Sequence, residues 1–185
     1  MTYTLKQYLD ADWHRLCSLV GAPHMPRRWN SHFGPRFAPV TLVRCAQTAH
    51  GRGWRRLAKL FSLANFMLFN IEVPARLPIG PGLVIPHPQG TVLGASSIGA
   101  NATIFHQVTL GGRVADFEYD PSRRPVVGDS VTLSVGAKIL GPLHLGDGCV
   151  VGANAVVLED VPPGALAIGV PAKIRRQDSE ENSHE

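Results

Sequence analysis

The segment VGDSVTLSVGAKILGPLHLGDGCVVGANAVV (127–157) carries an aliphatic residue at every sixth position, and the same spacing continues upstream as far as Val73. Two interruptions break the step of six: one extra residue before Val92 and a long insert before Val127. The thirteen aliphatic positions are Val73, Ile79, Ile85, Val92, Ile98, Ile104, Leu110, Val127, Leu133, Ile139, Leu145, Val151 and Val157. An α-helix has 3.6 residues per turn and cannot keep a six-residue repeat on one face, whereas short strands place alternate side chains inward. The repeat therefore predicts a mostly β chain that forms a parallel β-helix with three hexads in each coil.

A second set of inward positions supports this interpretation. A small or apolar residue often stands two places before the aliphatic one, which is the spacing of side chains on one face of a strand. These residues are Ala102, Val108, Val131, Ala137, Leu143, Cys149 and Ala155. Each hexad is therefore expected to send two side chains into the core.

The composition indicates one cored domain with a modest extension. The chain has 185 residues, of which 44% are hydrophobic and 17% are charged, and its formal net charge is +4. A basic balance suits anionic partners, but no nucleic-acid-binding motif accompanies it, so we expect no nucleic-acid partner. The three cysteines have no metal-ligand spacing and are interpreted as reduced thiols. Because no secretory signal starts the chain either, we expect a cytoplasmic protein.

The region that precedes the repeat, residues 1–70, shows helical spacing instead. Apolar residues recur there at intervals of three and four, which is typical of amphipathic helices. The predicted helices run over Thr4–Leu19, Val40–Ala49 and Trp54–Phe69. A loop is expected between the first two, over Arg27–Pro39.

The remainder of the chain divides into three parts by its pattern. The β-helix is expected to occupy residues 71–176. A loop insert at 113–125 leaves the coil, because the hexad spacing is lost there. The tail 177–185 is polar and acidic, so we expect it to be disordered.

The apolar run Leu57–Phe69 is too short and too interrupted to span a bilayer. We expect it to pack against the base of the β-helix or against a neighbouring subunit. The alternative, which we do not favour from the sequence, is a peripheral membrane contact, since Arg52, Arg55, Arg56 and Lys59 stand at the start of the run.

Three longer strings narrow the assignment: VTLGG (108–112), GAKILG (136–141) and GVPAKI (169–174). With these strings the chain resembles the hexapeptide-repeat acyltransferases, and specifically the serine acetyltransferases, from about Pro39 to Arg175. The resemblance implies a left-handed β-helix of triangular section and acetyl-CoA as co-substrate. It also implies a homotrimer whose active sites lie between neighbouring subunits.

His87 and His106 are predicted to stack at one corner of successive coils. They are nineteen residues apart, which is three hexads plus the extra residue, and each lies two residues past an inward isoleucine. Neighbouring coils should therefore separate them by about 4.8 Å, one strand spacing. Glu72 precedes His87 by fifteen residues, which places it in the layer on the other side of His87, near the same edge.

Acyl transfer from a thioester to an alcohol needs a base, and imidazole titrates in the right range when a carboxylate fixes its tautomer. The resemblance assigns His87 as this general base, with direct attack of the acceptor hydroxyl on the thioester. It assigns Glu72, at a position where the family has aspartate, as the carboxylate that orients His87. His106 matches a position that is often histidine in related enzymes, and it is either a structural residue beneath the site or part of the substrate site. A zinc site needs three protein ligands and these two histidines supply two, so we expect no metal.

The insert 113–125 corresponds to the substrate loop of the resembled family. Arg123 matches the family arginine that helps to hold the amino acid's carboxylate, while Arg124 stands where serine acetyltransferases have histidine. Pro86 replaces the family aspartate that receives the ammonium group of serine. Acetyltransferases of exopolysaccharide synthesis, the colanic-acid type, share this arrangement. Arg123 and Arg124 are therefore predicted to bind substrate, the alternative being a solvated basic turn.

The resemblance also implies a coenzyme A site along the later coils. Backbone groups there meet the pantetheine and basic residues meet the phosphates. Gly112, Ala137, Lys138 and Lys173 are the predicted contacts. The two lysines have an alternative interpretation as ordinary surface residues.

The sequence therefore predicts an acetyl-CoA-dependent O-acetyltransferase, with L-serine as the family's default acceptor. A sugar hydroxyl of a polysaccharide or glycan precursor is the alternative acceptor. A silent β-helix scaffold is the alternative of another class, and the retention of Glu72, His87 and the VTLGG string disfavours it. Many serine acetyltransferases dock a cysteine synthase through a carboxy-terminal isoleucine, and because this chain ends in Glu185 we expect no such complex.

Overall fold

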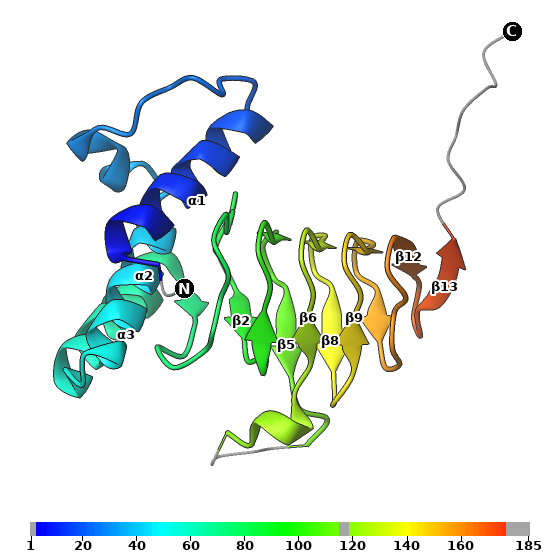
Figure 1. Cartoon of the computed structure of the whole chain (residues 1–185). Coiled ribbons are helices and arrows are strands. Elements are labelled where there is room, and N and C mark those ends of the chain that lie inside the picture. Colours follow the sequence, from blue (N-terminus) through cyan, green and yellow to red (C-terminus); the bar gives the residue numbers. More distant parts are fainter. Residues whose placement is uncertain (1–2, 115–118, 177–185) are drawn as a thin grey trace, which may run out of the picture.

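The computed structural model of the chain describes residues 3–114 and 119–176. Helices gather at one end of a long stack of short strands, and the chain runs along the stack toward its carboxyl end (Figure 1). From Ile71 onward the regular structure is almost all strand. Each of these strands is only two to four residues long, so much of every circuit is turn.

The helical part contains α1 (Leu5–Leu19), η1 (Trp29–Phe33), α2 (Ala38–Gly51) and α3 (Arg55–Phe69). Thr4 begins α1 with a capping box, because its hydroxyl accepts the N–H of Gln7 while the Gln7 side chain accepts the N–H of Thr4. α3 ends where Asn70 adopts a left-handed conformation, with φ 51°. The three predicted helices are present, and the short 3₁₀-helix η1 lies within the region predicted to be loop.

The strands β1 to β13, called the strand stack below, form three sheets in the described part of the chain. The first contains β1 (Ile71–Glu72), β2 (Thr91–Leu93), β5 (Thr109–Gly111), β8 (Lys138–Leu140) and β11 (Val156–Val157). The second contains β3 (Ser97–Ile98), β6 (Val126–Val127) and β9 (His144–Leu145). The third contains β4 (Thr103–Ile104), β7 (Thr132–Leu133), β10 (Val150–Val151), β12 (Ala165–Ile168) and β13 (Lys173–Arg176), and β13 alone is antiparallel to its neighbour.

The strand register confirms three hexads in each circuit. Leu133 pairs with Val151, eighteen residues later. In the first circuit the offset is nineteen, since Val84 pairs with Thr103. Each circuit therefore contributes one strand to each sheet, and parallel pairing joins successive circuits.

The inward positions are confirmed with one correction. Twelve of the thirteen aliphatic positions are at most 7% exposed, as are all seven of the small or apolar residues two places before them. The exception is Val92, which is half-buried, while Leu93 is fully buried and pairs with Leu110. The inward series therefore steps by eight from Ile85 to Leu93 and by five from Leu93 to Ile98. The turn that follows Ile85 therefore makes this step two residues longer than the usual six. The following step, from Leu93 to Ile98, is one residue shorter than six.

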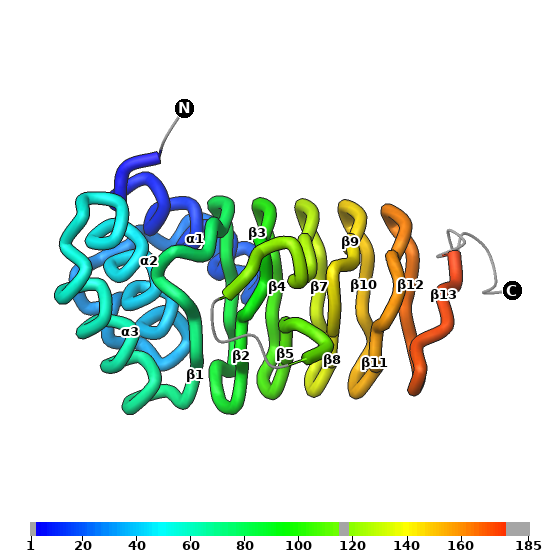
Figure 2. Tube along the Cα trace, turned by 90° about the horizontal axis from the view of Figure 1, so that it is seen from below, coloured from blue at the N-terminus to red at the C-terminus, as the bar shows by residue number. Residues whose placement is uncertain are grey.

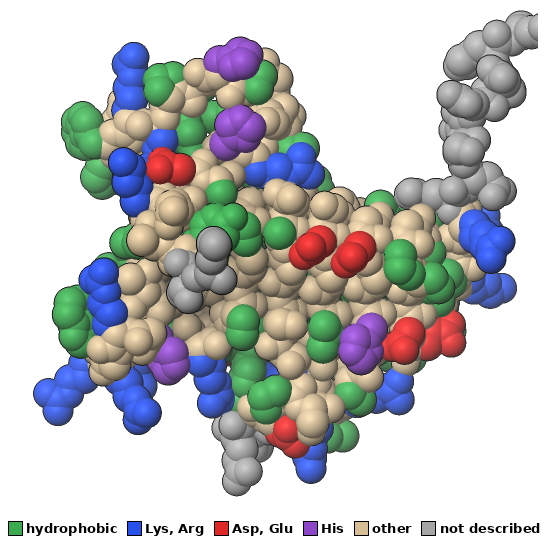
Figure 3. Space-filling model, in the orientation of Figure 1, with side chains coloured by type: hydrophobic (Ala, Val, Ile, Leu, Met, Phe, Trp, Pro, Cys, Tyr) green, Lys and Arg blue, Asp and Glu red, His purple; other side chains and the backbone are tan. Residues whose placement is uncertain are grey.

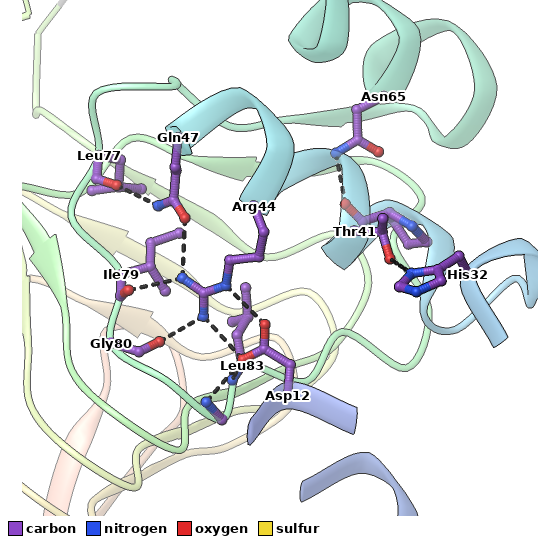
Figure 4. Close-up of polar contacts among 12 residues, drawn as sticks. Asp12, His32, Thr41, Arg44, Gln47, Asn65, Leu77, Ile79, Gly80 and Leu83 are labelled. Atoms are coloured by element: carbon purple, nitrogen blue, oxygen red, sulfur yellow. Dashed lines mark hydrogen bonds and ion pairs between the residues drawn. The ribbon is translucent and has the colours of Figure 1, made fainter. Parts of the chain in front are cut away.

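A buried ion pair joins the helical part to the first circuit (Figure 4). Asp12 of α1 accepts hydrogen bonds from Nε and Nη2 of Arg44, at 2.8 and 3.0 Å, and from the backbone N–H groups of Gly82 and Leu83. Both charged side chains are at most 1% exposed. Burial raises the pKa of the Asp12 carboxyl, and the hydrogen bonds from Arg44 and the backbone act in the opposite direction.

Arg44 completes the junction on its other side. Its guanidinium donates to the carbonyl oxygens of Ile79 and Gly80, at 2.8 and 2.6 Å. Gln47, one turn later on α2, donates to the carbonyl oxygen of Leu77 at 2.7 Å. These contacts satisfy carbonyl groups where the strand stack begins, so α1 and α2 cap its first circuit.

The chain leaves the strand stack after β5 and returns at β6, and the excursion lies on the outside of the stack (Figures 1 and 2). The short 3₁₀-helix η2 (Pro121–Arg123) forms part of it. Residues 115–118 of the predicted insert and the tail 177–185, predicted to be disordered, lie outside the described residues. Among the helices that the structure describes, none is both long and apolar enough to cross a membrane.

Candidate active site

His87 stands on the turn that leads into β2, and its side chain is exposed. The turn is closed by the N–H of Thr91, which donates to the carbonyl oxygen of Pro88 at 3.3 Å. It also rests on the next circuit, because the N–H of Gln107 donates to the carbonyl oxygen of Gln89 at 3.0 Å. The His87 side chain is therefore accessible from solvent in the single chain.

His106 lies at the same corner, one circuit further along. The ring centroids of His87 and His106 are 5.8 Å apart and the ring planes are almost perpendicular, at 89°. The predicted stacking of the two histidines is therefore confirmed, in an edge-to-face arrangement. The Nδ1 atom of His106 is buried and has no hydrogen-bond partner among the described residues.

The backbone of this histidine corner is a column of left-handed turn residues. Gly90, Gln107, Gly136 and Asn154 have φ angles of 69°, 59°, 71° and 55° in four successive circuits. The N–H of Gly136 donates to the carbonyl oxygen of His106 at 2.9 Å. Repetition of one turn geometry with bonds between the layers fixes the backbone that carries both histidines.

Glu72 lies at the end of β1, and its side chain is exposed. β1 runs beside β2, because Ile71 pairs with Thr91 and the N–H of Gly90 donates to the carbonyl oxygen of Asn70 at 2.8 Å. Glu72 is thus carried in the layer next to the turn that holds His87. Within the described part of the chain, however, the Glu72 carboxylate forms no hydrogen bond or ion pair, so the structure does not join it to His87.

Lys138 on β8 reaches the histidine corner. Its Nζ donates to the carbonyl oxygens of Gln107 and Gly136, at 2.5 and 3.0 Å. The ammonium group therefore lies beside the backbone that follows His106. Ala137 is completely buried in the single chain.

The other two residues predicted to bind coenzyme A lie away from the corner. Gly112 follows β5, at the opposite end of that strand from the turn of His106. Lys173 is exposed on β13, at the far end of the strand stack from β2 (Figure 1). A single chain does not bring Lys173 together with His87.

The returning part of the loop is anchored by aromatic and cationic contacts that the sequence analysis missed. The guanidinium of Arg124 lies 3.6 Å from the ring centre of Tyr119, and that of Arg76 lies 4.2 Å from it. The Tyr119 hydroxyl donates to the carbonyl oxygen of Ala95 at 2.7 Å, and Nη1 of Arg124 donates to that of Gly94 at 3.1 Å. Arg124 thus holds the loop on the strand stack in this structure.

Arg123 is placed differently from its neighbour. Its side chain is 61% exposed and pairs with Asp120 at 3.3 Å across one turn of η2. The guanidinium is open to solvent on the outside of the loop. The structure therefore separates the two arginines that were predicted to act together: Arg124 faces the strand stack and Arg123 faces outward.

Arg113 is a further residue that the sequence analysis missed. Its side chain donates to the carbonyl oxygens of Leu140 and Leu158, which lie in successive circuits. Gly141, the last residue of the GAKILG string, makes room for it, since a Cβ there would lie 2.8 Å from Nε of Arg113. The glycine is the only sequence signal for this contact, because its small size allows the close approach.

Metal and thiol chemistry find no support in the described residues. No group of three His, Cys, Asp or Glu side chains there could hold a metal ion. Cys149 is fully buried, and burial, with a smaller effect of Asp147, raises the pKa of its thiol to about 11. This thiol stays protonated at neutral pH and acts as a core side chain.

Comparison with known proteins places the chain among enzymes. No family model matches it. The serine acetyltransferase of Helicobacter pylori strain J99 is 39% identical over 145 residues, which are 78% of this chain and 83% of the relative. A serine acetyltransferase solved in complex with CoA superposes with a TM-score of 0.79 at 28% identity, over 92% of this chain and 69% of the other. The soybean serine acetyltransferase apoenzyme gives 0.77 at 32% identity, again over 92% and 69%. The chain therefore belongs to the serine acetyltransferase family of hexapeptide-repeat acyltransferases.

Proposed function

We propose that the chain transfers an acetyl group from acetyl-CoA to the hydroxyl of L-serine. The observation that carries this proposal is the histidine corner, where an exposed His87 meets His106 in a chain 39% identical to a serine acetyltransferase. A related enzyme has been solved with CoA, and that of Neisseria gonorrhoeae in complex with serine. We infer that the strand stack is a left-handed β-helix and that three copies assemble with the histidine corner at their interface.

His87 acts as the general base in this proposal. Its imidazole takes the proton of the serine hydroxyl while the oxygen attacks the thioester carbonyl. The resulting tetrahedral intermediate collapses with loss of the coenzyme A thiolate, and the protonated His87 returns the proton to that sulfur. General-base help of this kind contributes about 10²–10⁴ in rate, and positioning of the two substrates contributes further.

Glu72 orients His87 by accepting a hydrogen bond from its second ring nitrogen. Catalytic hydrogen bonds often tighten only when substrate is bound, which reconciles this role with the open geometry of the free chain. Its position supports the role, since β1 runs directly beside the strand that follows the His87 turn. His106, whose ring centre lies 5.8 Å from that of His87, is either a structural residue beneath the site or part of the substrate site.

Coenzyme A and the acceptor are held by residues of the later circuits and the loop. Lys138 and Lys173 are proposed to meet phosphate or carbonyl groups of coenzyme A. The Nζ atom of Lys138 already donates to two carbonyl oxygens beside His106. Gly112 and Ala137 are proposed to contribute backbone contacts. The outward-facing Arg123 is the candidate for the acceptor carboxylate. Arg124 is proposed to support the acceptor site from its position on Tyr119.

A sugar hydroxyl is the second candidate acceptor. Pro86 and Arg124 stand where the family pattern has an aspartate for the serine ammonium group and a loop histidine. Proline offers no charge to an ammonium group, and Arg124 is already engaged with Tyr119 and Gly94. These two positions favour an acceptor that does not carry the charges of an amino acid.

Thiol release from acetyl-CoA, measured with L-serine, homoserine and a panel of sugars as separate acceptors, tests the proposal. We expect release that depends on L-serine. Release with sugars alone would replace serine by a glycan acceptor. Failure of every acceptor on the panel to cause release would overturn the proposed function in favour of a silent scaffold.

A further inference from the structure

Helix α3 turns its apolar side chains away from the rest of the chain. Ala58 and Asn65 are buried, whereas Leu60, Leu63 and Met67 are 59%, 56% and 73% exposed. With 100° between successive residues, these three project from the side of the helix opposite the two buried residues. The predicted packing of this run against the base of the β-helix is therefore wrong for these side chains, whereas the alternative, packing against a neighbouring subunit, stays a prediction.

We call the exposed apolar residues of this helix the α3 face. It consists of Leu57, Leu60, Leu63, Phe66, Met67 and Leu68, all at least 37% exposed. Single exposed apolar residues are common in proteins, but six on one short helix mark a surface that meets a partner.

Positive charge predominates around the amino-terminal end of the α3 face. Arg52, Arg55, Arg56 and Lys59 lie at the amino-terminal end of α3, and residues 38–69 contain no Asp or Glu. In Figure 3 the Lys and Arg side chains gather over the helices at the lower left, with no acidic side chain among them on the face in view. The partner of this surface is therefore expected to be anionic.

A basic groove of about 490 Å³ runs alongside α3. Arg55, Lys59 and Ser62 of the helix line it together with His50 of α2 and Arg76 of the first circuit, and none of the described lining residues is acidic. The Oγ atom of Ser62 is buried and has no hydrogen-bond partner among the described residues. A phosphate group fits this set of donors, since it offers charge and several acceptor oxygens.

We propose that α3 lies on a membrane surface rich in anionic phospholipid. The α3 face enters the boundary between headgroups and acyl chains, and the basic groove binds lipid phosphates. Trp54, 55% exposed and with the Arg52 guanidinium 5.5 Å from its ring centre, adds an aromatic residue of the kind found at membrane interfaces. A second copy placed face to face on this surface, as in a two-fold dimer, fits less well, because it would bring two sets of four cations together.

Flotation of the full chain with vesicles of phosphatidylcholine alone, and of phosphatidylcholine mixed with phosphatidylglycerol, tests the proposal. We expect binding only to the mixed vesicles, weakened by added salt. The variant Leu60→Ser/Leu63→Ser/Met67→Ser removes the apolar contact and is expected to stay in solution. The variant Arg56→Gln/Lys59→Gln is expected to lower the vesicle partition coefficient by roughly tenfold or more.

The matched control is Arg175→Gln/Arg176→Gln, which removes the same charge from β13 at the other end of the strand stack. It should bind vesicles as the unmodified chain does. If this control loses as much vesicle binding as Arg56→Gln/Lys59→Gln, binding depends only on the net charge of the chain. If the triple serine variant binds vesicles fully, the α3 face is not inserted into the membrane. Either result overturns the proposal. Absence of vesicle binding by the unmodified chain, with a lower oligomeric mass for the triple variant in sedimentation, would assign the face to contacts between copies instead.

Discussion

At the scale of single residues, the pair of Asp12 and Arg44 has the most evident effect on the fold. Two charges taken out of water are costly unless each is fully paired. Here the carboxylate accepts from one guanidinium and two backbone N–H groups, and the guanidinium also donates to two carbonyl oxygens. The pair therefore ties α1 and α2 to the first circuit of the strand stack, and its removal should destabilise the contact between the helices and that circuit.

The variant Asp12→Ala is expected to lower the free energy of unfolding by about 3–5 kcal/mol, because it leaves the buried Arg44 guanidinium and two backbone donors unpaired. Urea denaturation followed by circular dichroism measures this. Asp10→Ala on the same helix is the control, since Asp10 is 49% exposed in its pair with Arg27 and should cost at most about 1 kcal/mol. Equal effects of the two variants would show that the buried pair does not support the junction.

The sequence predicted some of these residues and not others for physical reasons. The histidine corner was predictable because a fixed repeat converts sequence distance into position, so nineteen residues bring His106 beside His87. Asp12 and Arg44 are thirty-two residues apart in segments with no repeat, and a charged residue in an amphipathic helix normally faces solvent. Nothing in the pattern distinguishes such a pair from two surface charges.

At the scale of elements, the length of each turn determines which residue of the following strand points inward. The hexad spacing located almost every inward side chain, because the interior of the stack is filled mainly by apolar residues. It misplaced one residue, Val92, because Val92 and Leu93 are both aliphatic and the preceding turn takes up two extra residues. Where a turn lengthens, the pattern identifies the circuit but not the residue that points inward.

Gly141 offers a test of the close contacts between circuits. Its φ is 111°, and a Cβ would lie 2.8 Å from Nε of Arg113. We expect Gly141→Ala to lower the free energy of unfolding by about 1–3 kcal/mol, since the new methyl group strains the backbone and displaces Arg113 from its carbonyl partners.

Gly148→Ala is the matched control in the same denaturation experiment. Gly148 is also left-handed, with φ 68°, but a Cβ at this position would meet no other atom of the described residues within 4 Å. The cost there should be about 1–2 kcal/mol, from the backbone conformation alone. If Gly141→Ala is no worse than this control, the Arg113 contact contributes nothing to the stack.

At the scale of the whole molecule, one chain presents an open site. His87 is exposed, the Glu72 carboxylate has no partner among the described residues, and Lys173 lies at the far end of the strand stack from His87. An assembly of copies explains these features together, because a neighbouring subunit can cover the histidine corner and bring its own later circuits to it. The sequence alone predicted this arrangement only through its resemblance to a family, since a repeat specifies the stack and not the packing of one stack on another.

The most direct test of the central claim is the rate of thiol release from acetyl-CoA by His87→Ala, compared with the unmodified chain under the acceptor that supports turnover. His144→Ala is the control, since His144 is exposed on β9 and outside the histidine corner. We predict that His87→Ala loses about 10²–10⁴ in kcat with an unchanged thermal unfolding profile, while His144→Ala keeps its activity. A His87→Ala protein that turns over at the rate of the unmodified chain would contradict the assignment of His87 as the general base.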